Sequence, residues 1–288
     1  MLSTRAKVGY VVGDLKAIER DGERSAALFR ELGERWGLMQ ATAWLGGLAE
    51  MLGDHGKAAR LQREGLRMAE ELGLWSEVSV RLAWLAWIAV RQCDYQQAWD
   101  LGREARRLAG EQGYRVGEIF AEVCLAFASR RRGDLEGAER YLTTLLHAAG
   151  RQQEGVPPPL HLPMVLTELG FLAEQRGQWA EARRLHLEGF AAARTLGEQR
   201  MVALAMEGLA GAVGSTGQHP ASARLLGVAD AIRRSASVPA APSVHAEIDR
   251  IAAMARRALG EPAFNAAYEH GAMLTRKTRA SADPDPAG

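Results

Sequence analysis

The sequence predicts an all-α protein: an α-solenoid of antiparallel helix pairs that repeat every 40 residues, with further helices capping its C-terminal end. Three observations lead to this fold. A turn step recurs at that period, leucine and small residues stand at fixed places around it, and apolar residues at helical spacing fill the intervals. The steps are Gly13-Asp14, Gly53-Asp54, Cys93-Asp94, Gly133-Asp134, Gly177-Gln178 and Gly217-Gln218, with one shift of four residues before the fifth. A period of this length is typical of stacked helical units.

Each step is predicted to join the two helices of one pair. Glycine suits the left-handed conformation that ends a helix, and the aspartate after it accepts hydrogen bonds from the free amides of the next helix. Between the steps lie two stretches of about 18 residues whose apolar positions are three and four residues apart, the pattern of a helix with one apolar face.

Fixed columns of residues predict how these helices pack. Eight residues before the five interior steps stand leucines: Leu45, Leu85, Leu125, Leu169 and Leu209. Five residues after the steps stand small residues: Ala58, Ala98, Ala138, Ala182 and Ser222. Small residues let helix backbones approach closely, while the leucines fill the space between them. Because a lone pair cannot bury its apolar faces, neighbouring pairs must stack.

The repeats are predicted to span residues 1–234, as a truncated first unit and five full units. Only 12 residues precede the first step, so we expect a fragment of a longer protein or a partner that covers this end. Gly150–Leu160 carries three prolines and reads as a surface loop, with a ligand-contacting elbow as the alternative. A linker over 235–243, capping helices over 244–274 and a disordered tail over 275–288 complete the chain.

Composition places the protein in solution and argues against several partners. With 36 basic and 35 acidic residues the net charge is +1, so no electrostatic footprint for nucleic acid or a membrane surface is expected. No apolar run is long enough to span a bilayer, which predicts a cytoplasmic protein. Cys93 and Cys124 lie in apolar helix patterns and are expected to be buried free thiols. The arginine-rich, lysine-poor usage is typical of a GC-rich bacterial genome.

No motif for catalysis, a metal or a cofactor is present. The seven histidines form no metal-ligand spacing, and no nucleophile elbow or dinucleotide fingerprint occurs. Around Gly53-Asp54 the sequence approaches a phosphate-binding loop, but Met51 stands where the first glycine should be. We therefore expect a protein without enzymatic activity, cofactor or bound metal.

The repeat resembles the tetratricopeptide repeat in its leucine and small residue, its Gly-Asp turn and the small residues of its second helix. That family's unit is 34 residues long, so these helices are each about a turn longer; the resemblance covers residues 1–234 and implies a right-handed superhelix. Ala223–Arg234 and Leu259–Gly271 resemble the end of the repeat region in MalT-like, AfsR-like and LuxR-type signal-transduction regulators. In that family an ATPase precedes the repeats and many members carry a DNA-binding domain; neither domain is found in this chain.

The tetratricopeptide resemblance implies that the first helix of each pair lines a concave groove. Carried over by column, the position six before the step gives Trp87, Phe127 and Phe171. The positions three and two residues before the step add polar and charged residues at the edges of the groove: Glu50, Arg91, Arg130, Arg131, Glu174 and Gln175. Phe120, seven residues before Phe127 on the same helix face, completes the predicted groove. Such a surface suits a peptide segment or a small organic inducer; the alternative is that the aromatic rings belong to the core.

The leading hypothesis is a non-catalytic interaction module, the partner- or ligand-binding arm of a bacterial transcriptional regulator that acts on an ATPase by population shift. Direct binding to nucleic acid or membrane is not expected. The alternative is a stand-alone scaffold or receptor without an ATPase, which would take an acidic or apolar peptide near Arg91, Arg130 and Arg131.

Overall fold

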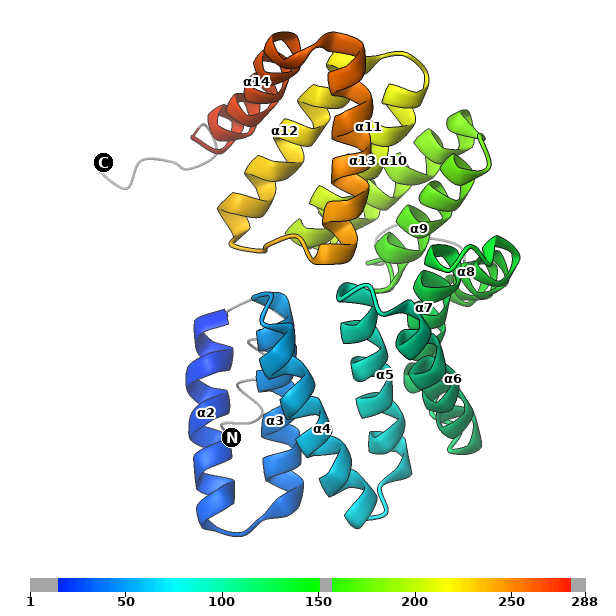
Figure 1. Cartoon of the computed structure of the whole chain (residues 1–288). Coiled ribbons are helices and arrows are strands. Elements are labelled where there is room, and N and C mark those ends of the chain that lie inside the picture. Colours follow the sequence, from blue (N-terminus) through cyan, green and yellow to red (C-terminus); the bar gives the residue numbers. More distant parts are fainter. Residues whose placement is uncertain (1–14, 151–156, 281–288) are drawn as a thin grey trace. The chain divides into compact units, whose positions relative to one another are not determined.

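The computed structural model describes residues 15–150 and 157–280, and in these ranges every regular element is a helix (Figure 1). The chain divides into two compact units, unit 1 (residues 1–134) and unit 2 (residues 135–288), each described by itself. Unit 1 contains α2 (Leu15–Glu31), α3 (Arg35–Met51), α4 (His55–Glu71), α5 (Trp75–Arg91), α6 (Tyr95–Glu111) and α7 (Arg115–Arg131). Unit 2 contains α8 (Leu135–Ala149), α9 (Leu162–Gln175), α10 (Trp179–Thr195), α11 (Gln199–Ser215), α12 (His219–Ala236), α13 (Pro242–Leu259) and α14 (Glu261–Ala280). Successive helices pack in pairs, which confirms the predicted all-α repeat fold.

The turns follow the predicted chemistry. Gly53 has a φ of 84° and ends α3 in the left-handed conformation. Asp54 then caps α4 by accepting a hydrogen bond of 2.8 Å from the backbone amide of Lys57. Asp94 caps α6 in the same way, whereas the glutamines of the last two steps make no side-chain cap bond. The first step, Gly13-Asp14, lies outside the described residues.

A second series of left-handed glycines ends the second helix of four pairs, halfway between the predicted steps. Its members are Gly33, Gly73, Gly113 and Gly197, with φ values between 61° and 70°. Most helices between these turns are 17 residues long. The 40-residue repeat is therefore two similar helix-turn units that differ in which faces they bury.

The predicted small-residue column lies in the core. All five residues five positions after the steps are fully buried. Leu125 is fully buried as well, and a Cβ added to Gly102 on α6 would lie 3.1 Å from its side chain. The close approach of α6 and α7 thus depends on the leucine of the predicted column and on a glycine, Gly102, that lies outside the predicted small-residue column.

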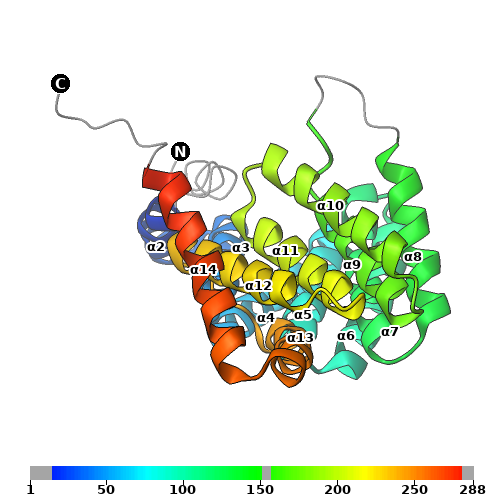
Figure 2. The same cartoon turned by 90° about the horizontal axis from the view of Figure 1, so that it is seen from above.

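At the C-terminal end, α12 continues to Ala236 and α14 to Ala280, so helices occupy part of the residues expected as linker and tail. Residues 281–288 lie outside the described residues. Helices α12 and α14 pack against each other in both views (Figures 1 and 2). A Cβ added to Gly227 would lie 1.9 Å from the carbonyl oxygen of Tyr268, and one added to Gly271 would lie 2.0 Å from that of Arg224. Both glycines belong to the C-terminal signature, which therefore encodes a backbone-to-backbone helix crossing.

The two cysteines differ, which corrects the expectation of two buried thiols. Cys124 is buried on α7, and burial raises the pKa of its thiol above the ordinary value. Cys93 is exposed because it occupies the glycine place of the turn between α5 and α6, with a φ of 66°.

Candidate functional site

The three aromatic rings predicted for the groove are buried. Trp87 and Phe127 in unit 1 are 5% and 4% exposed, and their rings meet edge to face at 5.3 Å. Phe171 in unit 2 is 1% exposed and meets the ring of His186 at 4.9 Å. The contact of Trp87 with Phe127 joins neighbouring repeats, whereas Phe171 and His186 lie on the two helices of one pair, α9 and α10.

Of the charged residues predicted beside Trp87, Arg91 and Glu50 neutralise each other within unit 1. Arg91 forms an ion pair with Glu50 on α3, with Nε and Oε1 at 3.1 Å, and both side chains are buried. The same carboxylate accepts a hydrogen bond of 3.2 Å from Trp87 Nε1. Arg130 is buried, while Arg131 is half-buried and stacks over the ring of Phe127 at 5.0 Å.

In unit 2 the predicted groove residues lie beneath α13. Phe171 packs in one cluster with Val244 of that helix. The buried carboxylate of Glu174 pairs with Arg250 of α13 at 3.0 Å, whereas the neighbouring Gln175 is exposed. Helix α13, which follows the last repeat, thus covers the face of α9 that carries Phe171 and Glu174.

A groove of half-buried aromatic side chains lies instead on α3, α5 and the start of α7. It contains a cavity of about 230 Å³. The unit 1 groove, as we call it, is lined by Gln40, Ala43, Trp44, Glu77, Val80, Arg81, Trp84 and Tyr114. Phe120, one of the residues predicted for the groove, meets the Trp84 ring edge to face at 5.1 Å. The sequence carries a signal for this site in a column other than those that predict the groove: Trp44 and Trp84 both stand nine residues before a step.

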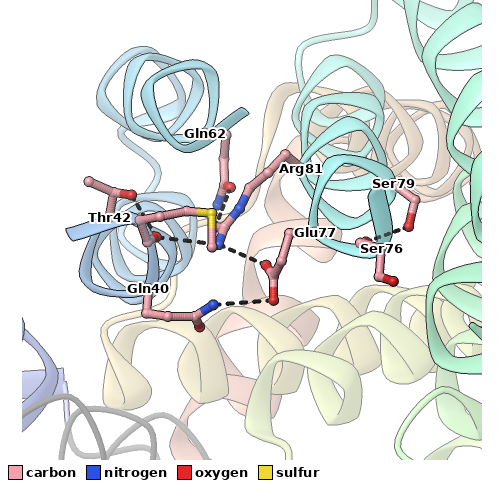
Figure 3. A network of polar contacts seen from close by, with 8 residues as sticks. Gln40, Thr42, Gln62, Ser76, Glu77, Ser79 and Arg81 are labelled. Atoms are coloured by element: carbon pink, nitrogen blue, oxygen red, sulfur yellow. Dashed lines mark hydrogen bonds and ion pairs between the residues drawn. The ribbon is translucent and has the colours of Figure 1, made fainter. Parts of the chain in front are cut away.

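A buried arginine organises the polar side of the groove (Figure 3). Arg81 is 1% exposed, and its guanidinium reaches three elements. Nη1 donates to Gln62 Oε1 of α4 at 3.2 Å, and Nη2 donates both to the carbonyl oxygen of Met39 on α3 and to Glu77 Oε2. The other oxygen of Glu77 accepts from Gln40 Nε2 at 3.2 Å. These bonds hold the two carboxylate oxygens of Glu77 and the guanidinium of Arg81 in one orientation.

The charges of Arg81 and Glu77 hold this side of the groove in a fixed shape, which favours binding of a partner. Burial lowers the pKa of Arg81 from its ordinary value, and the carboxylate of Glu77 acts in the opposite direction. The side chain of Glu77 remains 32% exposed at the groove. A carboxylate held by two internal donors keeps lone pairs free for a third donor from outside, so the groove combines aromatic walls with one accessible acceptor.

The described residues contain no group of three His, Cys, Asp or Glu side chains placed to hold a metal ion. In the same part of the chain, none of the helices has the length and apolar composition that crossing a bilayer requires.

Comparison with known proteins supports the fold. No family model matches the chain, and no curated protein matches it. Among solved structures it is similar to the crystal structure of BtubC (BKLC) from P. vanneervenii, with a TM-score of 0.56 and 21% sequence identity. The alignment covers 77% of this chain and 91% of the other. At this identity the likeness shows a shared helical-repeat fold.

Proposed function

We propose that this chain is a non-catalytic interaction module whose unit 1 groove holds an apolar side chain of a protein or peptide partner. The observation that carries the proposal is the cavity between Trp44, Trp84 and Tyr114, next to the fixed carboxylate of Glu77. Tryptophan and tyrosine are the residues that most often dominate binding energy at protein interfaces.

The size of the cavity favours a peptide over a small organic ligand. Sites for drug-sized molecules usually measure about 300–1,000 Å³, and this cavity of about 230 Å³ is smaller. It suits one large side chain of a segment that lies across α3 and α5. The exposed acceptor of Glu77 suits a backbone amide or a basic side chain next to that apolar residue.

Selection from a phage-displayed peptide library on the full chain tests this proposal. We expect enriched peptides to share an aromatic or large aliphatic residue. The affinity of each for Trp84→Ala should fall by roughly 30-fold, the equivalent of a hot-spot loss of about 2 kcal/mol.

Trp75→Ala is the matched control, because Trp75 lies on the same helix, is half exposed and does not line the cavity. Its affinity should match that of the unmodified chain. Peptides that lose the same affinity in both variants, or a library that yields no peptide dependent on Trp84, would contradict the proposal.

The finer hypothesis is that this module is the sensor or partner arm of a bacterial signal-transduction transcriptional regulator. It is supported by the C-terminal signature and by the helix crossing at Gly227 and Gly271 that the signature encodes. Partner binding would favour one curvature of the repeats and pass that preference to an ATPase. Co-purification with an ATPase, or genomic sequence that continues the reading frame into one, supports this role; a frame without an ATPase and no such partner would exclude it.

The alternative is a stand-alone scaffold or receptor for an acidic peptide. Arg131 favours it, since this side chain is half-buried whereas Arg91 and Arg130 are buried. On this alternative, Arg131→Glu weakens peptide binding, and the loss shrinks as salt is raised. Unchanged affinity in that variant would remove the alternative and leave the aromatic groove as the binding surface.

A further inference from the structure

Unit 2 contains a second and larger cavity, the C-terminal cavity, of about 570 Å³. It lies between α12, the connection to α13, and α13 and α14. Its volume falls within the range of sites for small organic ligands, about 300–1,000 Å³. Most of its wall is apolar and comes from Leu226, Val238, Pro239, Ala240 and Ile248. Burial of an apolar body there would remove it from water, which is the main favourable contribution to ligand binding.

A buried ion pair lies at this cavity. Arg233 on α12 is 7% exposed and donates from Nε and Nη2 to the two carboxylate oxygens of Glu207 on α11, at 2.6 and 2.8 Å. The third nitrogen, Nη1, is buried and has no hydrogen-bond partner among the described residues. A buried donor left unpaired is costly, and a charged donor more so than a neutral one. An acceptor that reaches this nitrogen would therefore gain a charge-assisted hydrogen bond.

The other charged groups of the cavity already have partners. Arg234 pairs with Asp230 at 2.8 Å, and the phenol of Tyr268 on α14 lies next to that carboxylate. Burial, with Asp230 next to it, raises the pKa of Tyr268 to about 12, so the phenol stays protonated at neutral pH. His245 on α13 is exposed and lines the same cavity, where it offers a further ring nitrogen. A ligand in this cavity would therefore meet an apolar wall and hydrogen-bond donors, chiefly Nη1 of Arg233.

We propose that the C-terminal cavity binds a small organic acid, an apolar body that carries one carboxylate or sulfonate directed at Arg233. Such a ligand touches α12, α13 and α14 together, so its binding stabilises the docking of the last two helices on the repeats. This site is separate from the unit 1 groove, and it stands or falls independently of the function proposed for that groove.

Two fluorescent probes with the same body test the proposal. 8-Anilinonaphthalene-1-sulfonate carries the acid group, and N-phenyl-1-naphthylamine is its neutral counterpart. We expect the sulfonate to bind the full chain saturably at one site, and about tenfold to a hundredfold more tightly than the neutral probe, the range of a charge-assisted hydrogen bond. Equal affinities of the two probes would overturn the assignment of an acid.

Variants locate the site and identify the donor. Ala240→Phe fills the cavity without touching the ion pair and should weaken both probes at least about tenfold. The double variant Glu207→Leu/Arg233→Met replaces the pair by apolar groups, which is often tolerated in a core, and should abolish the preference for the sulfonate while the neutral probe still binds. Circular dichroism establishes that each variant is folded; should the double variant not fold, Ala240→Phe and the probe comparison still decide.

Two controls separate this site from others. Arg257→Met removes an exposed arginine on α13 that does not line the cavity, and Trp44→Ala alters the unit 1 groove. Neither should change the affinity of the sulfonate. Binding that survives Ala240→Phe unchanged, or that is lost in Trp44→Ala, would contradict the C-terminal cavity as the site.

Discussion

Gly227→Ala should force α12 and α14 apart. The added Cβ would lie 1.9 Å from the carbonyl oxygen of Tyr268, and the neighbouring contact at Gly271 would have to open with it. Because non-bonded heavy atoms pack at about 3.5–4.0 Å, the two backbones must separate by roughly 1.5 Å or more. A backbone carbonyl within a helix cannot rotate away as a flexible side chain would, so the whole crossing has to move.

The change in the free energy of unfolding on Gly227→Ala combines opposing contributions. Overpacking of a close contact costs about 1–3 kcal/mol, and sometimes more. Alanine in place of a helical glycine gains about 1 kcal/mol through helix propensity. The separation also loosens the packing of Phe264, a buried ring of α14, on the core that contains Leu226 and Ile251. We expect a net loss of about 2 kcal/mol, concentrated in α14.

Hydrogen exchange read by mass spectrometry measures this locally, since repeat proteins do not always unfold in one step. Peptides from α14 should exchange faster in Gly227→Ala, with α3 to α5 unchanged. Gly56→Ala is the control: it is exposed on α4, its nearest neighbour would be 3.6 Å away, and it should leave exchange in α14 unaltered. Protection of α14 equal to that of the unmodified chain would refute the crossing.

Three further predictions concern unit 1. Leu125→Ala should cost about 2–5 kcal/mol in denaturant unfolding, because the leucine is fully buried; a loss near zero would contradict its place in the core. Arg91→Met should cost about 3–5 kcal/mol because it leaves Glu50 buried without its ion pair, while the double variant Glu50→Gln/Arg91→Met should be much closer to the original stability; equal losses in both would argue against the pair. With a thiol reagent at neutral pH, Cys93 should react in the native protein and Cys124 only after unfolding, since burial raises the pKa of the latter; two equally fast thiols would contradict this.

The fold was predictable because its rules are local and recur. A left-handed glycine followed by a capping aspartate ends one helix and starts the next wherever the pair occurs, as at Gly53 and Asp54. The columns of small residues are set by close helix approach, which repeats with every pair. The chemistry of Cys93 was harder to foresee, because its apolar neighbours suggested a helix while the turn geometry exposed it.

The site depended on information that a repeat pattern lacks. Which face of a first helix lies open depends on how far the helix is rotated in its packing, and aromatic residues stand on several faces here. The rings of the column that contains Trp87 are buried, whereas Trp84, three residues earlier, borders a cavity. The covering of Phe171 by α13 was likewise outside the pattern, because α13 follows the last repeat and has no counterpart in it.

Fluorine NMR on the chain labelled with 5-fluorotryptophan tests the central proposal most directly, since its seven tryptophans report on different surfaces at once. On addition of a selected peptide, the resonances of Trp44 and Trp84 should shift and saturate together. Those of the exposed Trp36, Trp75 and Trp179 should stay in place. Shifts confined to the exposed tryptophans, with Trp44 and Trp84 unchanged while the peptide is bound, would contradict the unit 1 groove as the binding surface.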